Sequence, residues 1–124
     1  MKSEWSNSWK SSMQPRKQRK FLFNAPAHIK QKKMTAPLSK TLRKEHNKRS
    51  LVVRVGDEVK IVRGDFKGKK GKVEKIIKPN ERVIINNVSR VKVDGTKANA
   101  PVHASKIMIT KINLEDSKRI RSKK

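Results

Sequence analysis

The middle of this chain shows short alternations of apolar and polar residues, which is the pattern of half-buried β-strands. β-Branched residues dominate the apolar positions, and turn-forming pairs, Pro79-Asn80 and Asp94-Gly95, separate some of the runs. Because the runs are short and closely spaced, we expect five or six short strands rather than a few long ones. These strands are expected at residues 51–55, 58–63, 71–78, 82–86, 88–93 and 106–112.

The most distinctive stretch, residues 55–73, reads VGDEVKIVRGDFKGKKGKV. Apolar residues at both ends flank a loop with three of the protein's five glycines, Gly64, Gly68 and Gly71. This pattern predicts a strand, a tight basic loop and a second strand, because Gly supplies the positive φ that sharp turns need. The loop combines backbone amides, several cations and the flat ring of Phe66, so its natural complement is a polyanion.

Closure into a barrel is the expected arrangement of residues 51–113. So many short strands in about 60 residues, each with apolar positions on one side, predict a small and strongly bent sheet. A closed sheet also hides its edges from other chains. Val73 and Ile76 break the strict alternation, which indicates a bulge that would help the sheet to curl.

Two helical segments are expected ahead of this domain. Residues 27–36 lie between two prolines and have room for a turn or two of helix. Residues 38–46 carry two leucines four positions apart, which form one narrow apolar stripe. Ser39 can cap the start of this helix, and Asn47 can adopt the left-handed conformation that ends it. The helix should therefore dock on the barrel and leave its cations outward.

Charge divides the chain into parts. Residues 1–50 carry 14 Lys and Arg against two acidic residues, residues 51–113 carry 15 against six, and residues 114–124 carry five against two. The first 14 residues hold too few apolar side chains to offset the entropy of ordering, which predicts a disordered tail. We interpret residues 15–50 as a basic arm and the last stretch as a basic C-terminal tail.

The overall charge points to a polyanionic partner. The chain has 34 Lys and Arg against 10 acidic residues, a formal charge of +24 that repels itself unless a polyanion is present. The longest apolar runs of the chain are three or four residues. A helix that spans a membrane needs about 20, so we expect no membrane insertion. The N-terminus lacks the apolar core of a secretory signal, and we expect a cytoplasmic protein.

Neither an enzyme nor a metal protein is expected. The chain has no cysteine, and its three histidines are scattered. The acidic residues stand singly, and no histidine has an evident nucleophile partner in the sequence. We therefore expect no metal, no cofactor and no small-molecule substrate.

The region around residues 55–77 resembles a KOW motif, the strand-loop-strand of SH3-like barrels in ribosomal proteins and in transcription elongation factors of the NusG type. The flanking stretches are more specific: RKQRKFLFNAP and APLSKTLRKEHNKRS before the barrel, and HASKIMITK within its last part. Over about residues 15–115 the chain resembles the archaeal and eukaryotic form of the universal large-subunit ribosomal protein family L-twenty-four, called L-twenty-six in eukaryotes. Elongation factors lack these flanks. The short C-terminal end is more similar to archaeal members.

This resemblance implies a mainly β fold, a small SH3-like barrel with a basic N-terminal arm that contains one or two short helices. It also implies a structural protein that binds the 5′ region of large-subunit rRNA early in assembly and lies near the exit of the peptide tunnel. The implied partners are rRNA, neighbouring ribosomal proteins, and targeting or nascent-chain factors at that exit. Two departures from the family pattern are visible. His46-Asn47 replaces an aromatic followed by Gly, and Ala104 replaces a common Pro, which would leave that loop looser.

We predict RNA binding through phosphates and shape, because A-form RNA hides its base edges in a deep, narrow major groove. On the barrel loop, Phe66 either stacks on a base or packs the loop, and the arm and loop act as one clamp. The loop cations expected to contact phosphates are Arg63, Lys67, Lys69, Lys70 and Lys72. The expected contacts of the arm and of the helix after it are Arg16, Lys17, Arg19, Lys20, Asn24, His28, Lys30, Lys32, Lys33, Lys40, Arg43, Lys44, Lys48 and Arg49.

Two other functions fit parts of the pattern. A transcription-linked KOW protein or an archaeal chromosomal protein would share the barrel and the charge, and competition between rRNA fragments and duplex DNA would separate these from a ribosomal protein. A protein-binding SH3-like module would need an aromatic groove for a proline-rich ligand. Residues 51–113 contain Phe66 but no Trp or Tyr.

Overall fold

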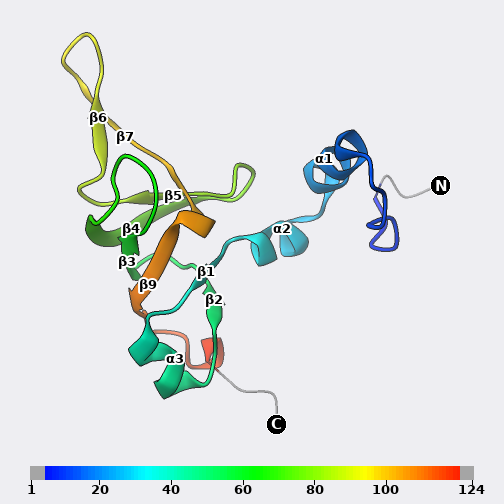
Figure 1. Ribbon diagram of the computed structural model, residues 1–124, viewed down its shortest axis with the longest axis horizontal. Helices are drawn as coiled ribbons and strands as arrows, with labels where there is room; N and C mark the ends of the chain where they lie inside the picture. Colours follow the sequence, from blue (N-terminus) through cyan, green and yellow to red (C-terminus); the bar gives the residue numbers. More distant parts are fainter. Residues whose placement is uncertain (1–4, 121–124) are drawn as a thin grey trace.

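The computed structural model describes residues 5–120 and combines helices with short antiparallel strands (Figure 1). This part of the chain is therefore a mixed α and β structure rather than a mainly β one. Its helices are α1 (Pro15–Asn24), α2 (Ala27–Lys33) and α3 (Lys40–His46), with 3₁₀ helices η1 (Ala104–Lys106) and η2 (Ser117–Arg119). Its strands are β1 (Thr35–Pro37), β2 (Ser50–Val52), β3 (Glu58–Ile61), β4 (Lys70–Ile77), β5 (Arg82–Ile85), β6 (Ser89–Val91), β7 (Lys97–Asn99), β8 (Val102–His103) and β9 (Ile107–Lys111).

The strands form three sheets in place of the single sheet expected from the sequence. The main sheet has the order β8-β5-β4-β3-β9, while β1 pairs with β2 and β6 pairs with β7. The two edge strands of the main sheet, β8 and β9, are consecutive in the chain and separated by η1 alone. This short connection holds the two edges of the sheet near each other, so the sheet must curve strongly.

Two of the expected strands belong to the smaller sheets. Residues 51–55 contribute β2, which pairs with β1, a strand that the sequence pattern did not predict. Residues 88–93 contribute β6, which with β7 forms a hairpin that projects from the body (Figure 1). Strands of two or three residues, such as β1, β7 and β8, are too short to show a periodicity of two, which explains why they were missed.

The expected bulge in β4 is confirmed. Val73 pairs with Ile85 and Lys75 pairs with Ile84, so the register shifts within β4. Gly71, the last glycine of the basic stretch and the first residue of the expected strand 71–78, lies inside β4 without a positive φ. A Cβ atom there would stand 2.5 Å from the carbonyl oxygen of Asn86, so the glycine permits a close approach of backbone next to the bulge.

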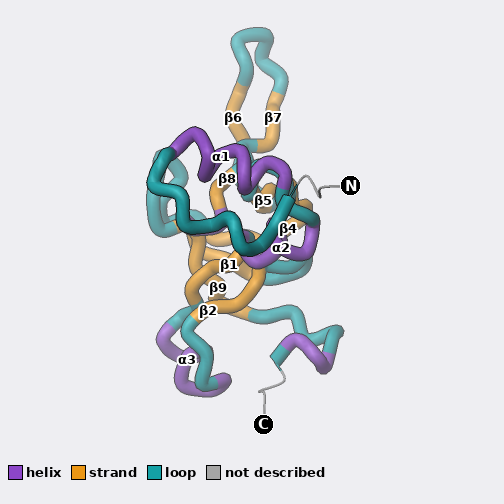
Figure 2. The backbone as a smooth tube through the Cα atoms, turned by 90° about the vertical axis from the view of Figure 1, so that its right-hand side faces the viewer, coloured by secondary structure: helices purple, strands orange, loops and turns teal. Residues whose placement is uncertain are grey.

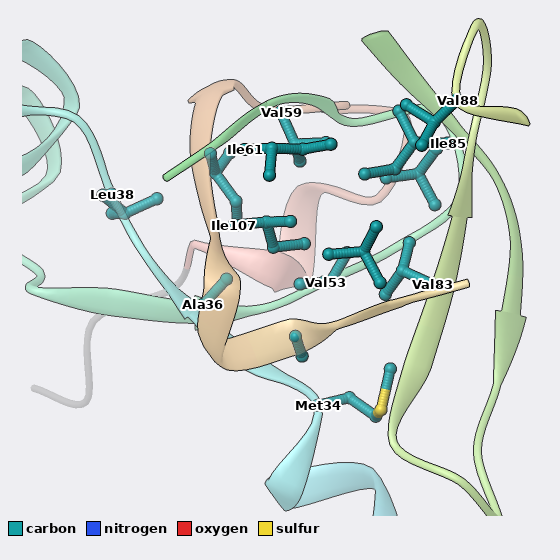
Figure 3. Packing of buried hydrophobic residues seen from close by; sticks show 14 of the residues in the cluster. Met34, Ala36, Leu38, Val53, Val59, Ile61, Val83, Ile85, Val88 and Ile107 are labelled. Atoms are coloured by element: carbon teal, nitrogen blue, oxygen red, sulfur yellow. The ribbon is translucent and has the colours of Figure 1, made fainter. Parts of the chain in front are cut away.

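A compact apolar core lies between the main sheet and the β1–β2 pair (Figure 3). Val59 and Ile61 of β3 alternate with exposed or half-buried neighbours, as do Ile107 and Ile109 of β9. The segment that leads into α3 adds Leu38, which makes a parallel bridge to β9. The other buried apolar side chains of this cluster are Met34, Ala36, Val53, Val73, Val83, Ile85, Val88, Ala100, Val102, Ala104 and Ile112.

An ion pair beneath the C-terminal segment is the main polar feature of the interior. Asp57, which is 0% exposed, accepts hydrogen bonds from the backbone N–H of Arg54 and of Asn113, both at 2.9 Å. Its carboxylate also pairs with the buried guanidinium of Arg119, with 2.6 Å between Nη1 and Oδ1. Arg119 donates further to the carbonyl oxygen of Val52 at 3.0 Å. The pair thus fastens η2 to the sheets.

The local signals around α3 are confirmed. The hydroxyl of Ser39 accepts from the backbone N–H of Leu42 at 3.4 Å, and Asn47 has φ 50° in the left-handed region. Asn47 therefore ends α3 in the left-handed conformation that Gly commonly adopts at this position. Ala104 is fully buried in η1, and the looseness of that segment stays a prediction.

Helices α1 and α2 lie to one side of the sheets, and α3 lies at another end (Figures 1 and 2). The sequence analysis expected helix in residues 27–36 and 38–46, but the ten residues of α1 were expected only as an arm. Pro15 begins α1, where its missing N–H leaves no donor unsatisfied. Within residues 5–120 we find no helix long and apolar enough to cross a bilayer.

Candidate nucleic-acid interface

The loop between β3 and β4 is closed by its own backbone. Gly64 and Gly68 have positive φ, and the N–H of Gly68 donates to the carbonyl oxygen of Ile61 at 2.8 Å. The N–H of Ile61 in turn donates to the carbonyl oxygen of Lys69 at 2.9 Å. This tight closure directs the side chains outward, and the predicted contacts Arg63, Lys67 and Lys69 are all exposed.

Phe66 packs the loop onto the body. Its ring is half-buried against the apolar core, with the ammonium of Lys69 at 5.1 Å and the guanidinium carbon of Arg90 at 5.5 Å from its centroid. Arg90 of β6 also forms an ion pair with Asp65. Of the two roles expected for Phe66, these contacts favour packing over stacking on a base. They also bring Arg90 into the candidate interface, although no sequence signal linked it to Asp65, 25 residues earlier.

Strand β4 extends the cationic surface beyond the loop. Lys70 and Lys72 are both exposed and alternate with residues that face the core. Lys70 is the register partner of Lys60 on β3. Like charges directly opposite each other are unfavourable across a sheet, and a bound polyanion would relieve the repulsion. Lys60 was missed, although strand alternation in residues 58–63 could have placed it on this outer face.

Helix α1 presents four of the predicted cations on one side. Residues 16, 17, 19 and 20 follow the 3.6-residue period closely enough to share a face, and all are exposed. Trp5 covers Phe21 of the same helix, with 5.0 Å between ring centroids and a 2.9 Å hydrogen bond from the indole Nε1 to the Phe21 carbonyl. Residues 1–4 lie outside the described part of the chain, and disorder of residues 1–14 stays a prediction.

The end of α1 and all of α2 continue this charged surface. Asn24, His28, Lys32 and Lys33 are exposed. Lys30 is half-buried because its ammonium group donates to the carbonyl oxygen of Phe23 at 2.7 Å and lies 5.8 Å from the centroid of that ring. Lys30 therefore helps to hold α2 against the end of α1.

The predicted cations around α3 have mixed surroundings. Lys40, Lys44 and Arg49 are exposed, so their charges are open to a ligand. Arg43 is exposed but donates from Nε to the carbonyl oxygen of Leu38 at 2.8 Å. Lys48 is half-buried, and its ammonium donates to the carbonyl oxygen of Ile120 at 3.1 Å. Lys48 therefore also ties the C-terminal segment to the body.

The predicted contacts occupy three separate parts of the molecule rather than one continuous patch. The β3–β4 loop, the helices α1 and α2, and helix α3 lie in different directions from the core (Figures 1 and 2). Of the 20 predicted residues, all are exposed except the half-buried Lys30, Lys48 and Phe66. A single partner that touches all three parts must therefore surround the protein, as a folded RNA can.

One cluster has the composition of a catalytic triad. The ring of His103 lies between the hydroxyl of Ser105, 2.8 Å from Nδ1, and the carboxylate of Glu81, 3.2 Å from Nε2. The sequence did not reveal this pairing. However, Nδ1 also accepts the backbone N–H of Ser105 at 3.2 Å, so His103 caps η1. We interpret the cluster as a structural link between the β4–β5 turn, β8 and η1.

Comparisons with known proteins agree on one family. A family model that describes the eukaryotic ribosomal proteins L26 and their archaeal L-twenty-four counterparts matches residues 12–123. The "Large ribosomal subunit protein uL24" of Methanosarcina barkeri is 47% identical over 111 residues, which cover 90% of this chain and 96% of that protein. The protein of the same name from Methanosphaera stadtmanae is 48% identical over 108 residues, which cover 87% of this chain and 92% of that protein.

These matches extend over the helices, the sheets and the C-terminal segment alike. They confirm the resemblance expected from the KOW-like stretch and its flanks. The family is one of structural ribosomal proteins and not of enzymes, which agrees with the absence of a catalytic pattern in the sequence. The chain belongs to this family of large-subunit ribosomal proteins.

Proposed function

We propose that this protein is a structural component of the large ribosomal subunit that binds rRNA without chemistry. The observation that carries the proposal is the exposure of cations on three separate parts of a chain with a net charge of +24. Such a distribution suits a folded polyanion that surrounds the protein, and it gives affinity through phosphates and shape. Family membership makes rRNA the polyanion to test first.

The contacts act as a set in this proposal. On one side, Phe66 holds the loop in shape, and phosphates bind to the loop cations Arg63, Lys67, Lys69, Lys70 and Lys72. The basic faces of α1 and α2 enter crevices of the RNA on another side, and α3 extends the contact. The curved main sheet works as a small SH3-like barrel that holds these parts at fixed distances.

The position in the ribosome is the finer part of the proposal, and it rests on the family resemblance. The protein binds the 5′ region of large-subunit rRNA early in assembly and lies near the exit of the peptide tunnel. Its partners there are neighbouring ribosomal proteins and, at the exit, targeting or nascent-chain factors.

Sedimentation tests the proposal directly. A tagged copy in cell lysate should migrate with the large ribosomal subunit through a sucrose gradient in moderate salt, in stoichiometric amount and together with large-subunit rRNA. Migration with RNA polymerase or with chromatin would contradict a ribosomal role and would favour the transcription-linked or chromosomal alternative. Competition between rRNA fragments and duplex DNA for the purified protein provides the matching measurement in solution.

A further inference from the structure

A small cleft lies where α1 and α2 meet the turn between β4 and β5. Its volume is about 220 Å³, and its apolar surface comes from Leu22, Ala25 and Ile29 together with Phe23. Sites for drug-sized ligands typically measure about 300–1,000 Å³, so this cleft suits a smaller group such as one base. The RNA contacts expected from the sequence include Arg19, Lys30 and Lys33 of this cleft but not Lys78 on the turn.

The rim of this cleft is strongly basic. Arg19, Lys30, Lys33 and Lys78 line it, against the single carboxylate of Glu81. That carboxylate is already engaged by His103, at 3.2 Å from Nε2. The charge of the rim therefore favours an anionic occupant, while the apolar surface favours a flat, weakly polar group.

Phe23 differs from the other two phenylalanines. Trp5 covers Phe21, and Phe66 packs on the core, but Phe23 is 81% exposed although Lys30 lies over its ring. An exposed aromatic ring beside a basic cleft is the arrangement on which proteins stack the bases of single-stranded nucleic acid. A helix of another protein would be too large for the cleft, and a proline-rich peptide would gain nothing from four surrounding cations.

We propose that this cleft receives one unpaired nucleotide of RNA. The base stacks on Phe23 and contacts Leu22 and Ile29, while its flanking phosphates lie near Lys33 and Lys78. This inference rests on the proposed function, because it names the kind of RNA feature that α1 and α2 recognise. It adds recognition of an unstacked base to a surface otherwise expected to read phosphates and shape.

The test compares substitutions of Phe23 in the full-length protein, with a large-subunit rRNA transcript as the probe. Phe23→Leu removes the stacking ring but keeps an apolar side chain, and it should raise the Kd about 5- to 100-fold. Phe23→Trp should bind as tightly as the original protein. The salt slope of log affinity should stay unchanged in both variants, because no phosphate contact is lost.

Phe21→Leu is the matched control, because it makes the same change two residues away on a ring that Trp5 covers. It should alter the Kd by less than about 3-fold, since a ring that stacks on no base contributes little to RNA affinity. Chemical probing of base edges should show one unpaired nucleotide whose reactivity changes with the original protein and with Phe23→Trp, but not with Phe23→Leu.

Two results would overturn the inference while leaving rRNA binding intact: unchanged affinity of Phe23→Leu, or equal losses in Phe23→Leu and Phe21→Leu. Failure of the original protein to prefer rRNA over duplex DNA would instead overturn the proposed function, and the nucleotide site with it.

Discussion

The curved sheet and the first two helices differ in what holds them in place. Strands β3, β5 and β9 each bury side chains in one shared core. Helices α1 and α2 contain no buried residue, and α1 and Trp5 mainly stabilise each other. The sheet is therefore specified by burial within the chain, while α1 and α2 present basic surfaces without burying a side chain of their own.

Hydrogen exchange should show the largest contrast between these two regions. Amides of β3 and β4 should open only with global unfolding, which typically requires about 5–15 kcal/mol, because their strands line the core. Amides of α1 should open at about 0–2 kcal/mol in the free protein, since no side chain of α1 is buried. Mass spectrometry of peptides after deuterium labelling measures both. Addition of rRNA should raise the protection of α1 and α2 more than that of β3 and β4. If the amides of α1 were protected as strongly as those of β3 before RNA is added, α1 would already belong to the folded body.

Asp57→Ala should give the next largest effect, within the body. The substitution leaves the guanidinium of Arg119 buried without its carboxylate, and loss of one partner of a buried pair typically costs about 3–5 kcal/mol. Urea denaturation measures the change in the free energy of unfolding. Glu115→Ala, which removes an exposed carboxylate from the same C-terminal segment, is the control and should leave that free energy unchanged within error. A loss below about 1 kcal/mol for Asp57→Ala would mean that the C-terminal segment is held by other contacts.

Lys69→Ala combined with Lys70→Ala tests whether the rigid body also binds RNA. Each lost phosphate contact should lower the magnitude of the salt slope of log affinity by about 0.7–0.9. The slope is measured from Kd values for an rRNA fragment at several salt concentrations. Lys111→Ala combined with Lys118→Ala removes the same charge outside the candidate interface and should change the slope less. If the slope of the Lys69→Ala, Lys70→Ala variant were unchanged, the loop would make no phosphate contact and RNA would bind through the helices instead.

Asp116→Asn should give the smallest effect. The hydrogen bond from Arg54 is the main cause that holds the pKa of Asp116 below its ordinary value. The carboxylate therefore stabilises the fold at pH values above its ordinary pKa of 3.8. This contribution is lost as the pH falls through the lower pKa that Asp116 has in the folded protein. The ion pair between Arg54 and Asp116 is exposed, so its contribution to stability is small. The urea midpoints of the original protein and of Asp116→Asn should therefore differ slightly at pH 7 and converge in acid. A difference that grows as pH falls would contradict this assignment.

Local signals in the sequence predicted much of what the structure contains. The alternation in residues 58–63, 71–78 and 106–112 located β3, β4 and β9, since one face of each strand must be buried. Ser39 and Asn47 marked the ends of α3, because capping depends on a residue's own side chain and φ. The exposure of the predicted cations followed from their charge, because burial of an unpaired cation is too costly.

Contacts between distant residues were not predictable in the same way. Arg119 appeared as part of a basic tail, yet it lies buried against Asp57, 62 residues away. Arg90 appeared as an ordinary strand residue, yet it pairs with Asp65 and covers Phe66. Nothing in the identity of a single Arg distinguishes a solvated side chain from one that enters an ion pair.

The sequence by itself determined a basic chain with a β-rich body, a short helix with a narrow apolar stripe, and a cationic loop, because periodicity, capping and charge act over a few residues. Only the tertiary structure decided how the strands divide among three sheets, which phenylalanine stays exposed, and which arginine is buried. Those outcomes depend on which surfaces meet when the sheet curves, and that geometry arises from all the strands together.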